Sequence, residues 1–132
     1  MIMANKQRVL PSPLPAPEDA EFFAAARDGR FLIKGCKDCG KSHWYPRTLC
    51  PYCFSANTAW QPASGRGTIY SCSPMRRVDP PYTVAYVSLA EGPTMMSNLV
   101  DCDPDQLAIG QAVKLVFKPS EDGTPVPCFT PA

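Results

Sequence analysis

The residues best suited to chemistry are four cysteines in two pairs, spaced as C-x2-C-x10-C-x2-C. A Cys-x-x-Cys turn places two sulfurs on one side of a tight knuckle, so two facing knuckles supply the tetrahedron of thiolates that zinc prefers. Coordination by four cysteines leaves no open position, which predicts a structural metal rather than a catalytic one. The predicted ligands of one zinc ion per chain are Cys36, Cys39, Cys50 and Cys53.

Iron is the main alternative ion, because Cys-x-x-Cys-Gly and Cys-Pro-x-Cys also resemble rubredoxin knuckles and a tetrahedron of sulfurs suits either metal. A thioredoxin-like redox pair is disfavoured, since it needs only one Cys-x-x-Cys, beside a βαβ unit. Gly40 can adopt the left-handed conformation that points backbone N–H groups at the thiolates. A hairpin between residues 43–45 and 48–49 fits into the spacer between the pairs.

The rest of the chain offers no catalytic constellation. His43 is the only histidine, and no nucleophile and carboxylate pair lies near it in sequence, so we expect a structural or surface histidine. The sequence contains no Gly-rich phosphate loop, Ser-nucleophile elbow or His-Glu metal motif. We therefore expect a protein that is not an enzyme, and a free-standing thioesterase has no candidate residues. The other cysteines are expected to be small buried hydrophobic residues: Cys72, Cys102 and Cys128.

Charge argues against a nucleic-acid partner. The chain has 13 basic and 12 acidic residues and a net charge of +1. Four thiolates around a zinc ion add a net charge of −2, whereas nucleic-acid binders normally carry a basic excess. Seven cysteines, an odd number, argue against a disulfide framework. With no secretory signal and no apolar run of about 18 residues, the sequence predicts a cytoplasmic protein that does not associate with a membrane.

The elements that must position these groups are short. Sixteen prolines in 132 residues break long helices, and residues 1–17 favour an extended arm. An amphipathic helix is predicted over Glu18–Asp28, with acidic residues in its first turn and Gly29 after its end. Phe22 and Phe23 share one side of this helix, where they either pack on the chain's own core or dock a partner.

Strand signals cover the remainder. Short strands are predicted around the cysteine pairs, and from Gly65 onward five candidates alternate with turns. The longer link between the third and fourth of these holds one helical turn at Pro104–Leu107, which matches an OB-fold barrel. The predicted fold is mainly β, with a short N-terminal helix, a rubredoxin-like four-cysteine zinc ribbon and a five-stranded OB-fold barrel. The predicted units are 1–30, 31–62 and 63–132, and the predicted strands are 31–36, 43–45, 58–62, 67–75, 82–91, 94–100, 112–117 and 125–130.

A candidate ligand surface lies on the first two barrel strands and their loop. Period two along residues 82–89 turns the smaller side chains inward and the tyrosines outward, where an OB-fold binds its ligand. Packing of these tyrosines on the zinc ribbon is the alternative. Two loop arginines either grip phosphates or are simply solvated, and Lys114 and Lys118 are expected to face solvent. The candidate ligand-binding residues are Arg76, Arg77, Tyr82 and Tyr86.

These features together resemble a known family. The segments that carry the resemblance are FFAAARDGRF, GCKDCG, YPRTLCPYC, GRGTIYSCS, PPYTVAYVSLAEGP and LAIGQAVKLVF. They are similar to the zinc-ribbon and OB-fold family catalogued as domain of unknown function number thirty-five, also called acyl-CoA-associated OB-fold proteins. The resemblance covers about residues 18–132.

The resemblance implies a function. Members of the family are non-catalytic accessory subunits of thiolase-like enzymes, or of acyl-CoA hydratases or aldolases. By this resemblance the chain binds such an enzyme and helps to enclose a CoA or acyl-CoA shared with it, and the four cysteines carry over as zinc ligands. Two other interpretations stay open at this point: a single-stranded nucleic-acid-binding module and a rubredoxin-like iron electron carrier.

Overall fold

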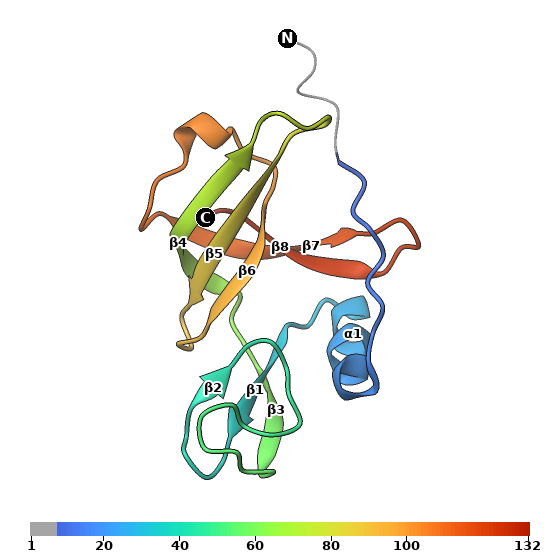
Figure 1. The fold of residues 1–132 in the computed structure, drawn as a ribbon, viewed down its shortest axis with the longest axis vertical. Coiled ribbons are helices and arrows are strands. Elements are labelled where there is room, and N and C mark those ends of the chain that lie inside the picture. Colours follow the sequence, from blue (N-terminus) through green and yellow to red (C-terminus); the bar gives the residue numbers. More distant parts are fainter. Residues whose placement is uncertain (1–7) are drawn as a thin grey trace.

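The described part of the chain forms two β-structures and one α-helix, with two short 3-10 helices (Figure 1). The computed structural model describes residues 8–132, so the first seven residues of the proline-rich arm lie outside the described part. The elements are η2 (Pro17–Asp19), α1 (Ala20–Arg27), β1 (Leu32–Cys36), β2 (Ser42–His43), β3 (Thr58–Pro62), β4 (Arg66–Met75), β5 (Tyr82–Leu89), β6 (Thr94–Leu99), η3 (Pro104–Gln106), β7 (Ala112–Pro119) and β8 (Pro125–Pro131).

The larger β-structure is a closed five-stranded barrel in the order β4-β5-β6-β8-β7. Its neighbours are antiparallel except β6 and β8, which pair in parallel at Leu99 and Phe129. The predicted OB-fold is confirmed, including the short helix η3 in the link before β7. Gly67 allows β4 to cross β5 closely, because a Cβ there would lie 2.7 Å from the Ser88 carbonyl oxygen. Along β5 the inward side chains are buried as predicted: Thr83, Ala85, Val87 and Leu89.

The smaller β-structure is a three-stranded sheet in the order β2-β1-β3. The hairpin expected within the cysteine spacer is wrong: β2 ends at His43 and pairs with β1 instead. The reason lies in the next two residues, which leave the sheet to pack beside the helix. The Trp44 ring lies 5.1 Å from the Phe22 ring, and the Tyr45 hydroxyl donates to the buried carboxylate of Asp19.

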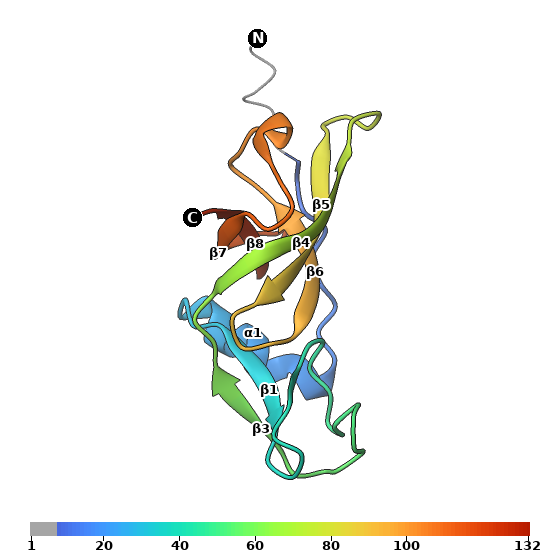
Figure 2. The same cartoon turned by 90° about the vertical axis from the view of Figure 1, so that its left-hand side faces the viewer.

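The helix joins the two β-structures. α1 contacts β1 on one side and β8 on the other, and Figure 2 shows it beside their junction. Phe22 and Phe23 are buried, so they pack on the chain's own core. Acidic residues lie in the first turn as predicted, Glu18 in η2 and Glu21 in α1, and Glu18 also accepts from the Thr48 hydroxyl at 3.0 Å. α1 ends before Gly29, whose φ of 77° closes the turn as predicted.

One hydrophobic core runs through the whole molecule. Phe31 and Ile33 of the ribbon belong to the same buried cluster as Val87 and Phe129 of the barrel. The ribbon therefore does not depend on its metal alone for attachment to the barrel. Because this core crosses the expected boundaries, the division into 1–30, 31–62 and 63–132 stays a prediction.

The described part of the N-terminal arm lies against the barrel. Leu10 is buried and forms a parallel bridge with Ser120, and its carbonyl accepts from the Glu121 N–H at 3.0 Å. The Asp122 N–H donates to the Ser12 hydroxyl at 3.0 Å. Within residues 8–132 no helix has the length and apolar character needed to cross a bilayer.

Candidate metal centre and ligand cavity

The structure brings the four predicted cysteines together. Their sulfur atoms all lie within 4.8 Å of one another. The sulfurs of Cys36 and Cys53 are 3.6 Å apart, and those of Cys39 and Cys50 are 3.7 Å apart. A tetrahedral ion with metal–sulfur bonds of about 2.3 Å needs sulfur separations of about 3.8 Å. The cluster therefore has the size that a tetrahedral tetrathiolate metal requires.

The two knuckles have the same backbone pattern. In the first, the Gly40 N–H donates to the Cys36 carbonyl at 2.9 Å, and in the second the Phe54 N–H donates to the Cys50 carbonyl at 2.9 Å. Both closing residues adopt positive φ, 77° at Gly40 and 65° at Phe54. Glycine tolerates this conformation, but a residue with a side chain loses about 1–2 kcal/mol in it. The second knuckle thus places an aromatic residue where the first has glycine.

Backbone donors surround the sulfurs and shift their protonation. The Cys39 N–H points at the Cys36 sulfur at 3.5 Å, and this contact is the main cause that lowers the pKa of Cys36. Burial opposes ionisation of Cys50, but the N–H groups of Cys53 and Tyr52 outweigh it and lower the pKa of Cys50 to about 7.

Cys53 behaves in the opposite way. The Ser55 N–H favours its thiolate, but partial burial and the neighbouring sulfurs outweigh this donor and raise the pKa of Cys53 to about 12. A metal ion must therefore displace at least one firmly held proton from the cluster. Binding releases protons, so the affinity for metal falls as the pH falls.

Side chains next to the cluster hold the knuckles against each other. Asp38 of the first knuckle accepts from the Asn57 amide at 3.0 Å and from the Ser55 hydroxyl at 2.5 Å. Hydrogen bonds from Ser55 and Asn57 lower the pKa of Asp38, so this carboxylate stays charged. With all four ligand positions supplied by the chain, the arrangement suits a structural metal and leaves no coordination position for a substrate.

A cavity of about 650 Å³ opens at the end of the barrel that holds the β4–β5 loop and the N-terminal arm. Two of the four predicted ligand-binding residues, Arg76 and Tyr82, line this cavity. The other two, Arg77 and Tyr86, are not among its lining residues. Tyr86 instead lies exposed on the outer face of β5. The four candidate ligand-binding residues are thus divided between a cavity, a loop and a sheet face.

Sequence reasoning missed two cations of this cavity. The Arg8 guanidinium lies 3.8 Å from the centre of the Tyr82 ring. Lys118 was expected to face solvent, but its side chain is only 29% exposed and its amine lies 2.6 Å from Asp101. The alternation of side chains along β7 predicted an exposed Lys118. The prediction is wrong because the end of β7 lies at the cavity, where Asp101 is close enough to pair with the amine. Arg76 is also paired, at 2.7 Å from Asp105.

His43 is a buried structural residue. Its side chain is almost fully enclosed, and neither ring nitrogen has a hydrogen-bond partner among residues 8–132. Burial lowers the pKa of His43 and keeps the imidazole neutral. No nucleophile in the described part of the chain is hydrogen-bonded to it, so it does not form a Cys-His or Ser-His pair. Of the remaining cysteines, Cys128 is fully buried as expected, while Cys72 and Cys102 are half-buried.

Comparison with known proteins identifies the family. A model described as the rubredoxin-like zinc ribbon domain of ChsH2 matches residues 23–59. A second model, the C-terminal OB-fold domain of ChsH2, matches residues 60–118. A "DUF35 domain-containing scaffold protein" of Methanocaldococcus jannaschii is 33% identical over 71% of this chain and 74% of its own length. The chain belongs to the DUF35 family. Both halves of the resemblance seen in the sequence are thereby confirmed.

Relatives of this DUF35 protein have informative descriptions. A "DUF35 domain-containing scaffold protein" of Methanothermobacter thermautotrophicus is 38% identical over 67% of this chain and 74% of its own length. A "Probable enoyl-CoA hydratase alpha subunit" of Thermomonospora curvata is 33% identical over 92% of this chain. The DUF35 chain spans only 40% of the length of the Thermomonospora protein.

Two solved structures share the fold. A chain of a structure described as "Ltp2-ChsH2(DUF35) aldolase" superposes with a TM-score of 0.79 and 31% identity, covering 91% of this chain and 98% of that one. A DUF35 protein of unknown function from Sulfolobus solfataricus superposes with a TM-score of 0.66 over 89% of this chain. At 12% identity the second likeness concerns the fold alone.

Replacing a single cluster cysteine should release the metal. We expect Cys53→Ser to reduce the metal content from about one ion per chain toward zero and to lower the melting temperature, because metal binding contributes folding free energy to such a site. Metal analysis and thermal unfolding measure the two effects. Cys102→Ser, outside the cluster, is the control and should keep its metal. Unchanged metal content and melting temperature in Cys53→Ser would contradict the ligand assignment.

Proposed function

We propose that this DUF35 protein is a non-catalytic accessory subunit, which binds a thiolase-like enzyme or a related acyl-CoA hydratase or aldolase and helps to form its acyl-CoA site. The names of the relatives support this proposal, since they describe scaffold proteins and a hydratase subunit. We also propose a cytoplasmic location, where seven thiols that form no disulfide in this structure would stay reduced.

One observation carries the proposal. The superposition on the chain from the two-component aldolase covers 98% of that chain at 31% identity. The likeness therefore extends across the ribbon, the helix and the barrel together rather than over one common module. A closed thiolate cluster and a buried, unpaired histidine are consistent with a subunit whose role is binding.

We propose zinc as the structural metal. Four thiolate ligands in a tetrahedron suit zinc or iron, and zinc is the usual ion of closed structural sites of this type. The purified protein is expected to be colourless with about one zinc per chain. Absorbance spectra with metal analysis make the distinction, and a red protein with stoichiometric iron would instead support the electron-carrier interpretation.

We propose that the barrel contributes to the CoA site through Arg76 and Arg77 in the β4–β5 loop and through Tyr82. Tyr86 was predicted with them, but it lies outside the cavity on the exposed face of β5, and we propose that it acts at the subunit interface instead. A phosphate-bearing ligand gains charge-assisted hydrogen bonds from loop arginines, and the cavity beside Tyr82 is large enough for part of a pantetheine chain. Asp105 holds Arg76 in place beside this cavity.

The arginine proposal is tested in the assembled complex. Replacing Arg76 and Arg77 together by alanine should weaken CoA binding about tenfold, as expected when a charge-assisted hydrogen bond is lost. Calorimetric titration of CoA into the complex measures the change. Arg66→Ala, at the opposite end of β4, is the matched control and should bind CoA like the unaltered protein. Equal affinity in all three complexes would rule out these arginines.

Complex formation is the direct test of the function. Co-expression with a thiolase-like, hydratase or aldolase subunit from the same organism should give a stable hetero-complex, with higher activity than the enzyme subunit alone. Size-exclusion chromatography and a turnover assay measure both effects. Should the two proteins elute separately and activity stay the same, the chain is not an accessory subunit of that enzyme.

A further inference from the structure

The outer face of three neighbouring barrel strands lacks charge. Arg66, the first residue of β4, is the only Lys, Arg, His, Asp or Glu in β4, β5 and β6. The other long barrel strand, β7, carries Lys114 and Lys118. Figure 1 shows β4, β5 and β6 lying side by side. Depletion of charge, with enrichment of aromatic residues and methionine, distinguishes the centres of protein interfaces from ordinary surface.

Large apolar side chains gather at the middle of this face. Tyr86 of β5 is directly paired with Met96 of β6, and on its other side with Ser71 of β4. Tyr70, at the irregularity before Ser71, is 65% exposed, while Met96 is 61% and Tyr86 47% exposed. We call Tyr70, Tyr86 and Met96 the uncharged barrel face.

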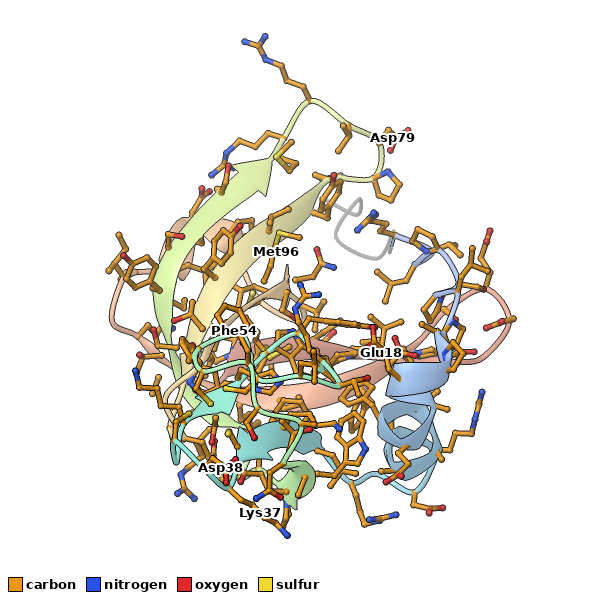
Figure 3. The ribbon with its side chains drawn as sticks, turned by 60° about the horizontal axis from the view of Figure 1, so that its bottom comes forward. Glu18, Lys37, Asp38, Phe54, Asp79 and Met96 are labelled. Atoms are coloured by element: carbon orange, nitrogen blue, oxygen red, sulfur yellow. The ribbon has the colours of Figure 1, made fainter. Side chains whose placement is uncertain are left out.

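Phe54 adds an exposed aromatic residue from the ribbon. It is 76% exposed and holds a left-handed backbone conformation that the matching knuckle assigns to glycine. Phe54 thus has an unfavourable backbone conformation, and its side chain makes few contacts within the protein. Such a combination indicates that the residue is needed for function rather than for stability. In the view of Figure 3, the labelled Phe54 lies between Asp38 of the first knuckle and Met96 of the barrel.

We propose that the uncharged barrel face and Phe54 form the surface on which the enzyme subunit docks, and that the subunit presents an uncharged, apolar surface to it. This inference rests on the proposed function. The chemistry selects a folded protein surface over the other partners of OB-folds. A single-stranded nucleic acid needs cations beside the stacking aromatics, and β4 to β6 supply none beyond Arg66. Addition of a partner strand needs a free sheet edge, and the barrel is closed.

Charge insertion tests the barrel face. Met96→Glu and Tyr86→Glu change exposed side chains, so the fold and melting temperature should be retained. Each places an unpaired charge against an apolar partner surface, and affinity for the enzyme subunit that forms the hetero-complex should fall about 30-fold or more, as for an interface hot spot. Leu14→Glu is the matched control, because Leu14 is apolar and 96% exposed but lies in the N-terminal arm, two residues after Ser12, which contacts Asp122 of the β7–β8 turn. Its affinity should match that of the unaltered chain in calorimetric titration.

A second variant separates binding from folding. Phe54→Gly supplies the residue that the left-handed conformation favours, so the melting temperature should rise by about 3 °C. The same change removes the proposed anchor, so affinity for the enzyme subunit should fall about tenfold. If Phe54 had only a structural role, Phe54→Gly would not raise the melting temperature and weaken docking at the same time.

The outcomes are distinct. If the unaltered chain binds the enzyme subunit and the Met96, Tyr86 and Phe54 variants bind equally well, the docking surface is wrong and the proposed function stands. If the chain binds no enzyme subunit, both fail. If Met96→Glu instead converts a homodimer of this chain into a monomer while enzyme binding is unchanged, the face joins two copies and the proposal is overturned.

Discussion

The convergence of four sulfurs within 4.8 Å is the constraint on which the ribbon depends. Ionised thiolates at this separation repel one another, and only a cation at their centre or retained protons can offset that repulsion. The N–H groups aimed at Cys36 and Cys50 favour ionisation, whereas the neighbouring sulfurs raise the pKa of Cys53. The backbone donors therefore favour metal binding, but only a bound cation can neutralise all four thiolates. A three-stranded sheet of this size buries too little surface to fold alone, so such an ion supplies folding free energy.

The metal site does not act in isolation, because an aromatic cluster fastens the ribbon to the rest of the molecule. The rings of Phe22 and Phe31 both contact the ring of Trp44, which lies just after the end of β2. The same core continues through Ile33 into the barrel. The ribbon and the barrel are thus held in one fixed arrangement. A subunit that docks through both parts needs this rigidity, since each interface residue held in place lowers the entropy lost on binding.

Charged side chains and exposed apolar side chains occupy different regions of the barrel surface. Cations near the barrel cavity are balanced by carboxylates, as in the pairs of Arg76 with Asp105 and of Lys118 with Asp101. The sheet face that carries Tyr86 and Met96 has neither sign. A mainly apolar cavity with charged residues in its lining, beside an uncharged sheet face, is consistent with the proposed roles of ligand binding at one region and protein docking at another.

The sequence by itself determined the four-cysteine cluster, the five barrel strands and the inward set on β5, because each rests on a local rule: the reach of a Cys-x-x-Cys turn, alternation along a strand, and turn residues between strands. The family followed from the same segments. Only the tertiary structure decided that Trp44 and Tyr45 leave the sheet for the helix, that Lys118 meets Asp101, and that Arg76 and Tyr82 line one cavity without Arg77 and Tyr86. Each of these depends on contacts between residues far apart in the chain, and no local pattern encodes such contacts. Phe54 lies between the two cases: aligning the knuckles places it opposite Gly40, but its backbone conformation and exposure come from the fold.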